Sequence, residues 1–164
     1  GGSLDLVAFN AGNNRFSPLL DMTDDFFEEV WRVCCFGGFL VGREAARHMV
    51  GQGSGSILFT GATASLRARP PFTAFASAKA GLRAVAQGMA REFGGQGIHV
   101  GHVIIDGAID GDQVNDRFPQ IREHKGDHGM LDIDAIADAF WALHTQHRSA
   151  WTHELDLRPF KEQF

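Results

Sequence analysis

The 164-residue chain is 44% hydrophobic and 21% charged, a balance that argues against a disordered segment and predicts one folded domain over residues 1–164. Its net charge of −5 provides no basic surface for nucleic acid, and no apolar run is long enough to cross a membrane, so we expect neither as a partner. Cys34 and Cys35 are adjacent, which rarely permits a disulfide bond. We therefore expect reduced thiols and a cytoplasmic protein.

Apolar runs and helical spacings alternate along the chain. The first run, 4–9, predicts a buried strand, and Thr23 is a suitable N-cap for a helix that continues to about residue 50. The other predicted elements are a strand at 56–60, a helix from 72 to about 93, a strand at 98–105, a helix from 132 to about 144 and a strand at 153–157. Residues 106–130 are predicted to form a loop with room for one helical segment.

The predicted strands at 4–9, 56–60 and 98–105 are mostly apolar and do not alternate regularly with polar residues. This pattern is typical of a parallel sheet that helices cover on both faces. The order of the elements, with strands and helices alternating, predicts the α/β class and three layers, α/β/α.

Four segments of the chain together resemble one family. Asn10-Ala11-Gly12, after the first strand, resembles the Asn-Ala-Gly signature of the short-chain dehydrogenase/reductase family, and 56–65 (SILFTGATAS) resembles the strand that leads to its catalytic Ser. The segment 75–79 (FASAK) falls where the family has Tyr-x-x-x-Lys, and 97–110 (GIHVGHVIIDGAID) resembles its sixth strand and nicotinamide loop. The chain is thus similar to the C-terminal two-thirds of such a protein, which implies a partial Rossmann-like fold with the family's strands 4–7.

The resemblance implies four catalytic positions, of which the chain retains one. In the family a Tyr is the general acid/base, a Lys lowers its pKa, a Ser polarises the substrate carbonyl and an Asn organises a water. Here the Tyr position is Phe75, the Ser position is Ala62 and the Asn position is Cys34, whereas Lys79 is retained. Proton transfer needs an ionisable group, and a phenyl ring has no proton to give. We therefore expect this chain to be unable to perform the family's hydride transfer.

The cofactor side of the family's site is also incomplete in this sequence. The family holds the pyrophosphate of NAD(P) at a glycine-rich turn between a strand and a helix. The nearest glycine cluster, 51–55, precedes a strand and has the wrong context. We expect no cofactor on this chain and NAD(P) on a full-length form. If a cofactor binds, the resemblance places it against Asn10, Ala11, Gly12, Lys79 and Ile109.

Several candidate site residues have two interpretations. Lys79 is either a retained ribose-binding residue or a helix lysine of an eroded site, and Thr63 either replaces the missing Ser or bonds to the backbone of its loop. Cys34 and Cys35 fit buried positions on an apolar helix better than reactive thiols. The histidine pairs at 124/128 and 144/147 lack further ligands at a diagnostic spacing, so no metal site is predicted.

Three hypotheses for the function remain open. The first is a catalytically silent domain that binds a small molecule or a partner. The second is an NAD(P)-dependent oxidoreductase whose full-length form uses altered acid/base chemistry. The third is a structural module that works through oligomerisation.

We also expect a homo-oligomer. The resemblance implies a sheet without the family's strands 1–3, which leaves 4–9 as an open apolar edge that is a template for pairing. Relatives commonly dimerise through two long helices, here about 23–50 and 72–93. Either surface is a candidate for a two-fold interface.

Overall fold

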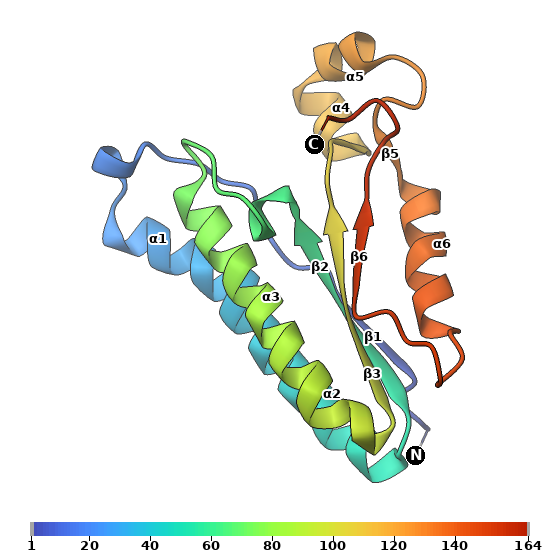
Figure 1. Ribbon diagram of the computed structural model, residues 1–164. Helices are drawn as coiled ribbons and strands as arrows, with labels where there is room; N and C mark the ends of the chain where they lie inside the picture. The colour runs from blue at the N-terminus through green and yellow to red at the C-terminus, as the bar shows by residue number, and fades with distance from the viewer. Residues whose placement is uncertain (1, 164) are drawn as a thin grey trace.

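A parallel sheet forms the centre of the computed structural model, which describes residues 2–163 except for the side chains of Gln113 and Arg117. Its four strands are ordered β1-β2-β3-β6, and every neighbouring pair is parallel (Figure 1). The strands are β1 (Leu6–Phe9), β2 (Gly55–Ala62), β3 (Ile98–Ile105) and β6 (Glu154–Leu157). These are the four strands predicted from the sequence, and they lie side by side in the order of the chain.

Helices cover both faces of this sheet, as Figure 1 shows. On one face lie α1 (Asp24–Trp31), α2 (Gly37–Gln52) and α3 (Thr73–Phe93), and on the other lies α6 (Ile133–His144). Side chains alternate between these faces along each strand: Phe59 of β2 packs with Met49 and Leu82, whereas its neighbour Leu58 packs with Leu143. The predicted α/β class with three layers is confirmed. No helix among residues 2–163 is both long and apolar enough to cross a membrane.

The long helix predicted from Thr23 is interrupted. Thr23 is its N-cap, with the side-chain oxygen accepting a hydrogen bond from the backbone N–H of Phe26 at 3.2 Å. Between α1 and α2, however, Arg32–Phe36 forms a turn of π-helix, and this turn carries the buried Cys34 and Cys35. The segment of this turn, RVCCF, contains no proline or glycine that would mark an interruption, which explains why the sequence predicts a single helix here.

The prediction of a mostly irregular segment at 106–130 is wrong. This part of the chain contains β4 (Ile109–Asp110), α4 (Asp112–Arg117) and α5 (Pro119–Lys125), and β4 pairs in parallel with β5 (Leu131–Asp132). The two helices are short and lie beyond the ends of β3 and β6 (Figure 1). They form a wall over the carboxyl edge of the sheet, where open α/β folds bind ligands.

Candidate functional site

A cavity of about 890 Å³ lies at the carboxyl edge of the sheet. Its walls come from the segment that connects β2 to α3, the segment after β3, α5 and the last residues of the chain. Parallel strands bring their carboxyl ends to the same edge, so segments far apart in the sequence meet there. The position and size are those expected of a small-molecule site.

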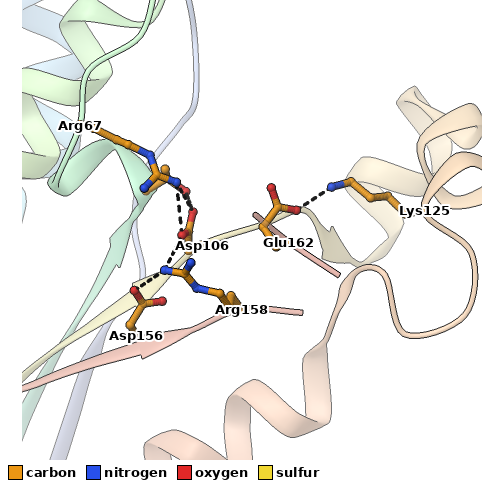
Figure 2. Close-up of polar contacts among 7 residues, drawn as sticks. Arg67, Asp106, Lys125, Asp156, Arg158 and Glu162 are labelled. Carbon is orange, nitrogen blue, oxygen red and sulfur yellow. Dashed lines mark hydrogen bonds and ion pairs between the residues drawn. The ribbon is translucent and has the colours of Figure 1, made fainter. Parts of the chain in front are cut away.

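Asp106 is the most buried charge in the wall of this cavity. It follows β3, is 2% exposed, and accepts a short hydrogen bond from the Thr63 hydroxyl. Arg158 lies 2.9 Å from its Oδ2 and also 2.7 Å from Asp156, while the Arg67 guanidinium approaches both Asp106 oxygens at 3.4 Å. Figure 2 shows how the two arginines converge on this carboxylate from different elements. The opposite charges and the hydroxyl compensate for the cost of burying Asp106.

The opposite wall contributes a second ion pair. Lys125, the last residue of α5, lies 2.6 Å from a carboxylate oxygen of Glu162 (Figure 2). This contact joins α5 to the C-terminal segment of the chain. The pair neutralises itself and leaves the arginines as the remaining cationic groups of the wall.

Lys79, in α3, is not among the residues that line the cavity. Its side chain is buried, and its Nζ donates a hydrogen bond to the backbone carbonyl of Thr60 at 2.7 Å. The Phe75 ring centroid is 5.8 Å from the same Nζ. Burial lowers the pKa of Lys79, an effect that the nearby Cys34 sulfur opposes in part. Lys79 therefore faces an aromatic ring and a carbonyl, and the ring offers no hydroxyl for it to activate.

The turn after β2 is held by a buried polar network. The Ser65 hydroxyl accepts from the Ala62 backbone N–H at 3.1 Å and lies 3.5 Å from Nε2 of His102. His102 Nδ1 lies 3.0 Å from Glu154, which in turn accepts two hydrogen bonds from Arg83. Burial lowers the pKa of His102, and the bonds from Arg83 lower that of Glu154.

The same network fixes the backbone that carries Thr63. A Cβ on Gly61 would lie only 2.3 Å from His102 Nε2, so the imidazole requires glycine at this position. The order Ser65, His102, Glu154 is like that of a hydrolase triad, but the first two side chains are 5% and 0% exposed. A substrate has no access to this serine, so the network has a structural role.

The structure brings together some of the residues predicted for the site and separates others. Gly12, after β1, lies against Lys79 and Cys34: a Cβ there would be 3.3 Å from Lys79 Nζ and 3.5 Å from the Cys34 Sγ. Thr63 bonds to the Asp106 carboxylate and not to its own loop backbone.

The other predicted residues lie away from this group. Ile109 lies in β4 and packs with the apolar cluster on the α6 face of the sheet. Asn10 and Ala11 are exposed after β1.

The sequence prediction missed the residues that give the cavity its charge. Asp106, Arg67 and Arg158 are separated by up to 91 positions in the numbering of the chain, and no motif connects them. One signal was available for Asp106, since it directly follows an eight-residue strand of mostly apolar residues, and parallel sheets place functional side chains at such strand ends. Among the residues that the structure describes, no group of three potential metal ligands comes together.

Comparison with known proteins identifies the family. Residues 1–121 match the family model for short chain dehydrogenase. The chain belongs to the short-chain dehydrogenase family. The predicted resemblance is thereby confirmed.

The relatives of this short-chain dehydrogenase chain are longer than the chain itself. Versicolorin reductase 1 of Dothistroma septosporum is 37% identical over 108 residues, which cover 66% of the chain and 40% of the relative. A Melia azedarach protein, (21S)-21-acetoxyl-apo-melianone synthase, is 35% identical over 148 residues, or 84% of the chain and 54% of that protein. The chain thus spans about half or less of the length of these relatives.

Solved structures agree in fold. A short-chain dehydrogenase from Rhodopseudomonas palustris is 45% identical, with a TM-score of 0.77 over 96% of this chain and 63% of that one. Gluconate 5-dehydrogenase from Burkholderia cenocepacia, in complex with NADP and tartrate, has a TM-score of 0.83 at 23% identity, over 96% of this chain and 64% of its own. At that identity the likeness concerns the fold alone.

Proposed function

We propose that this chain binds a small polar molecule at the carboxyl edge of its sheet and does not perform the Tyr- and Ser-dependent proton transfer of its family. The observation that carries the proposal is the position of the polar groups. Phe75 and Ala62 provide no hydroxyl, whereas Thr63, Arg67 and Asp106 line a cavity of about 890 Å³. Without a group that donates a proton to a carbonyl, the site binds its ligand and leaves it unchanged.

The described residues do not fit a complete dinucleotide. Lys79 is buried and donates to the Thr60 carbonyl, so the structure does not present its ammonium as a free ribose contact. Residues 2–163 contain no strand, glycine-rich turn and helix in the order that holds a pyrophosphate. We therefore expect no appreciable binding of NAD or NADP to this chain.

Three measurements test the proposal. Isothermal titration with NAD, NADP and their reduced forms is expected to detect no binding in the low micromolar range. The double variant Phe75→Tyr/Ala62→Ser, which restores both hydroxyls, is expected to give no NADPH-dependent carbonyl reduction above the Lys79→Ala control. A fragment screen by NMR is expected to perturb resonances of Thr63 and Ala108. Turnover by the double variant, or a screen that perturbs neither residue, would contradict the proposal.

A second candidate function is that of an NAD(P)-dependent oxidoreductase in a longer protein. It is supported by the family match over residues 1–121 and by two structural neighbours described as complexes with NADH and with NADP. In such a protein Gly12, Lys79 and Asn10 would belong to the cofactor side. NADPH turnover by a form that carries a glycine-rich strand–turn–helix before Gly1, together with no turnover by this chain, would favour this candidate.

We also propose that the chain works as a cytoplasmic homo-oligomer. In support, large apolar side chains are exposed along α1, the π-helical turn and α2, among them Trp31, Val33, Phe39, Leu40 and Val41. Both cysteines are free and buried, in keeping with a reducing compartment.

A stable monomer in light scattering at micromolar concentration would contradict the oligomer. If the β1 edge is the interface, Val7→Pro is expected to dissociate or unfold the protein, because proline removes a backbone donor.

A further inference from the structure

The charges around the cavity do not cancel. Four cationic side chains (Arg67, Arg69, Lys125 and Arg158) lie in its wall or directly behind it, against three carboxylates (Asp106, Asp156 and Glu162). This leaves one net positive charge, in a chain whose net charge is −5. Local charge of one sign in a cleft attracts ligands of the opposite sign. The cavity therefore favours an anion.

Two arginines are the cations least closely paired with carboxylates. Arg69 is exposed at the cavity and forms no ion pair with any residue of the described range 2–163. Arg67 reaches Asp106 only at 3.4 Å, and its Nε has no hydrogen-bond partner there. By contrast, Lys125 and Arg158 hold carboxylates at 2.6 and 2.9 Å. The planar guanidinium matches the geometry of a carboxylate with two parallel bonds, so Arg67 and Arg69 suit a carboxylate ligand.

Thr63 restricts the rest of the ligand. Its hydroxyl hydrogen is committed to the Asp106 carboxylate, which can only accept. The Thr63 oxygen therefore offers lone pairs to the cavity and requires a donor on the ligand. A second negative charge on the ligand would be repelled by Asp106 and Glu162, which also line the wall. These contacts favour a singly charged group with a neighbouring hydroxyl over a phosphate.

We infer that the cavity binds a small hydroxycarboxylic acid. The carboxylate lies against Arg67 and Arg69, and the hydroxyl of the ligand donates to Thr63 Oγ1. The inference rests on the proposed function, since it names the ligand class of the same site. It adds two residues that set specificity, Arg69 for the carboxylate and Thr63 for the hydroxyl.

Four small probes separate the contributions of charge and hydroxyl. Glycerate carries both groups, propionate only the carboxylate, glycerol only hydroxyls, and inorganic phosphate a different anion. Titrated into the 164-residue chain at low salt and followed by NMR, glycerate is expected to bind most tightly, and glycerol about tenfold or more weakly. Arg69→Gln is expected to weaken glycerate about threefold or more, whereas Arg91→Gln, an exposed arginine at the end of α3, leaves it unchanged. Thr63→Val is expected to weaken glycerate and leave propionate unaffected.

The outcomes separate this inference from the proposed function. Equal affinity for glycerol and glycerate, tighter binding of phosphate, or no difference between Arg69→Gln and Arg91→Gln overturns the hydroxy-acid inference. In each of these cases ligand binding at Thr63 and Ala108 still supports a small-molecule site. If glycerate fails to bind at millimolar concentration, the inference fails, and the fragment screen then decides whether the proposed function fails with it.

Discussion

Lys79 and Asp106 are both buried ionisable side chains near the ends of β2 and β3, and they differ in the groups that surround them. Asp106 has a hydroxyl and two guanidinium groups around it. Lys79 has a backbone carbonyl, an aromatic ring and a thiol nearby, and burial lowers its pKa. A buried charge with opposite charges around it can stay ionised and recognise a ligand, whereas one without them tends toward its neutral form.

This contrast explains how the site differs from that of its family. By the resemblance to the family, Lys79 of α3 stands at the position of the family's lysine, and Phe75, at the position of its Tyr, has no hydroxyl. The charged and polar side chains that line the cavity lie on the side of Thr63 and Asp106. The presence of Lys79 in the sequence therefore does not imply that it has the role of the family's lysine.

The largest effect is expected from Asp106→Asn. The variant keeps the shape of the side chain but leaves Arg67 and Arg158 facing each other without the carboxylate between them. We expect a loss of about 2–4 kcal/mol in the free energy of unfolding, measured in urea. The matched control is Asp156→Asn, which removes the other carboxylate bound by Arg158. Because the Asp156 side chain is 33% exposed, its loss is expected to cost about 1 kcal/mol or less. Equal losses in the two variants would contradict this difference.

His102 provides an intermediate case, since it is fully buried but has Glu154 beside it. Burial lowers its pKa below the ordinary 6.5, so between that lowered value and 6.5 the unfolded chain binds more protons than the folded one. The free energy of unfolding therefore falls as the pH is lowered below 6.5, by at most about 1.4 kcal/mol per pH unit for one group. His99 adds a slope of the same sign, because burial lowers its pKa too.

The test of this case is the variant His102→Gln, compared with the natural chain in urea unfolding at several pH values. The slope below pH 6.5 is expected to be shallower in the variant. The contribution of Glu154 is separate, because its lowered pKa gives stability that is present above 4.5 and lost only as the pH falls below that value. If the free energy of unfolding has the same pH dependence in the variant and the natural chain between pH 4.5 and 6.5, His102 is not the group that causes it.

Lys79→Met is expected to change the free energy of unfolding at pH 7 by only about 1 kcal/mol, because the lost bond to Thr60 is offset by the removal of a buried charge. The informative measurement is the free energy of unfolding at alkaline pH. Between its lowered pKa and 10.5, the unfolded chain protonates Lys79 more than the folded chain does, so stability rises with pH through this window. The variant loses this rise, whereas Lys161→Met, at an exposed lysine, retains it. The Cys35 thiol, whose pKa burial raises, contributes the opposite slope in both variants.

The smallest effect on stability is expected from Phe75→Tyr, within about 1 kcal/mol. The chain has no tyrosine, so this variant contains a single phenol whose ionisation can be followed by ultraviolet absorbance. A nearby ammonium favours the phenolate, and we therefore expect the phenol pKa to be lower in Phe75→Tyr than in Phe75→Tyr/Lys79→Met. If the two phenols titrate together, Lys79 does not influence position 75, and the contrast with Asp106 widens.

Much of the architecture follows from the sequence. The apolar runs at 56–60 and 98–105 identify β2 and β3, and Thr23 marks the start of α1, because burial on both faces and helix capping leave local signatures. The irregularities were not predictable in the same way. The π-helical turn at Arg32–Phe36 contains no proline or glycine to mark it, and α4 and α5 are too short to show a clear period.

The sequence by itself also determined that Phe75 and Ala62, at the positions that the resemblance gives to the family's Tyr and Ser, have no hydroxyl in any conformation. Only the tertiary structure decided which polar groups lie together at this edge of the sheet. Arg67, Asp106 and Arg158 come from three segments that the parallel sheet brings to one edge, and their ion pairs depend on distances that no local pattern encodes. The same holds for Lys79, since its pKa depends on burial and on its neighbours in space, which a motif does not record.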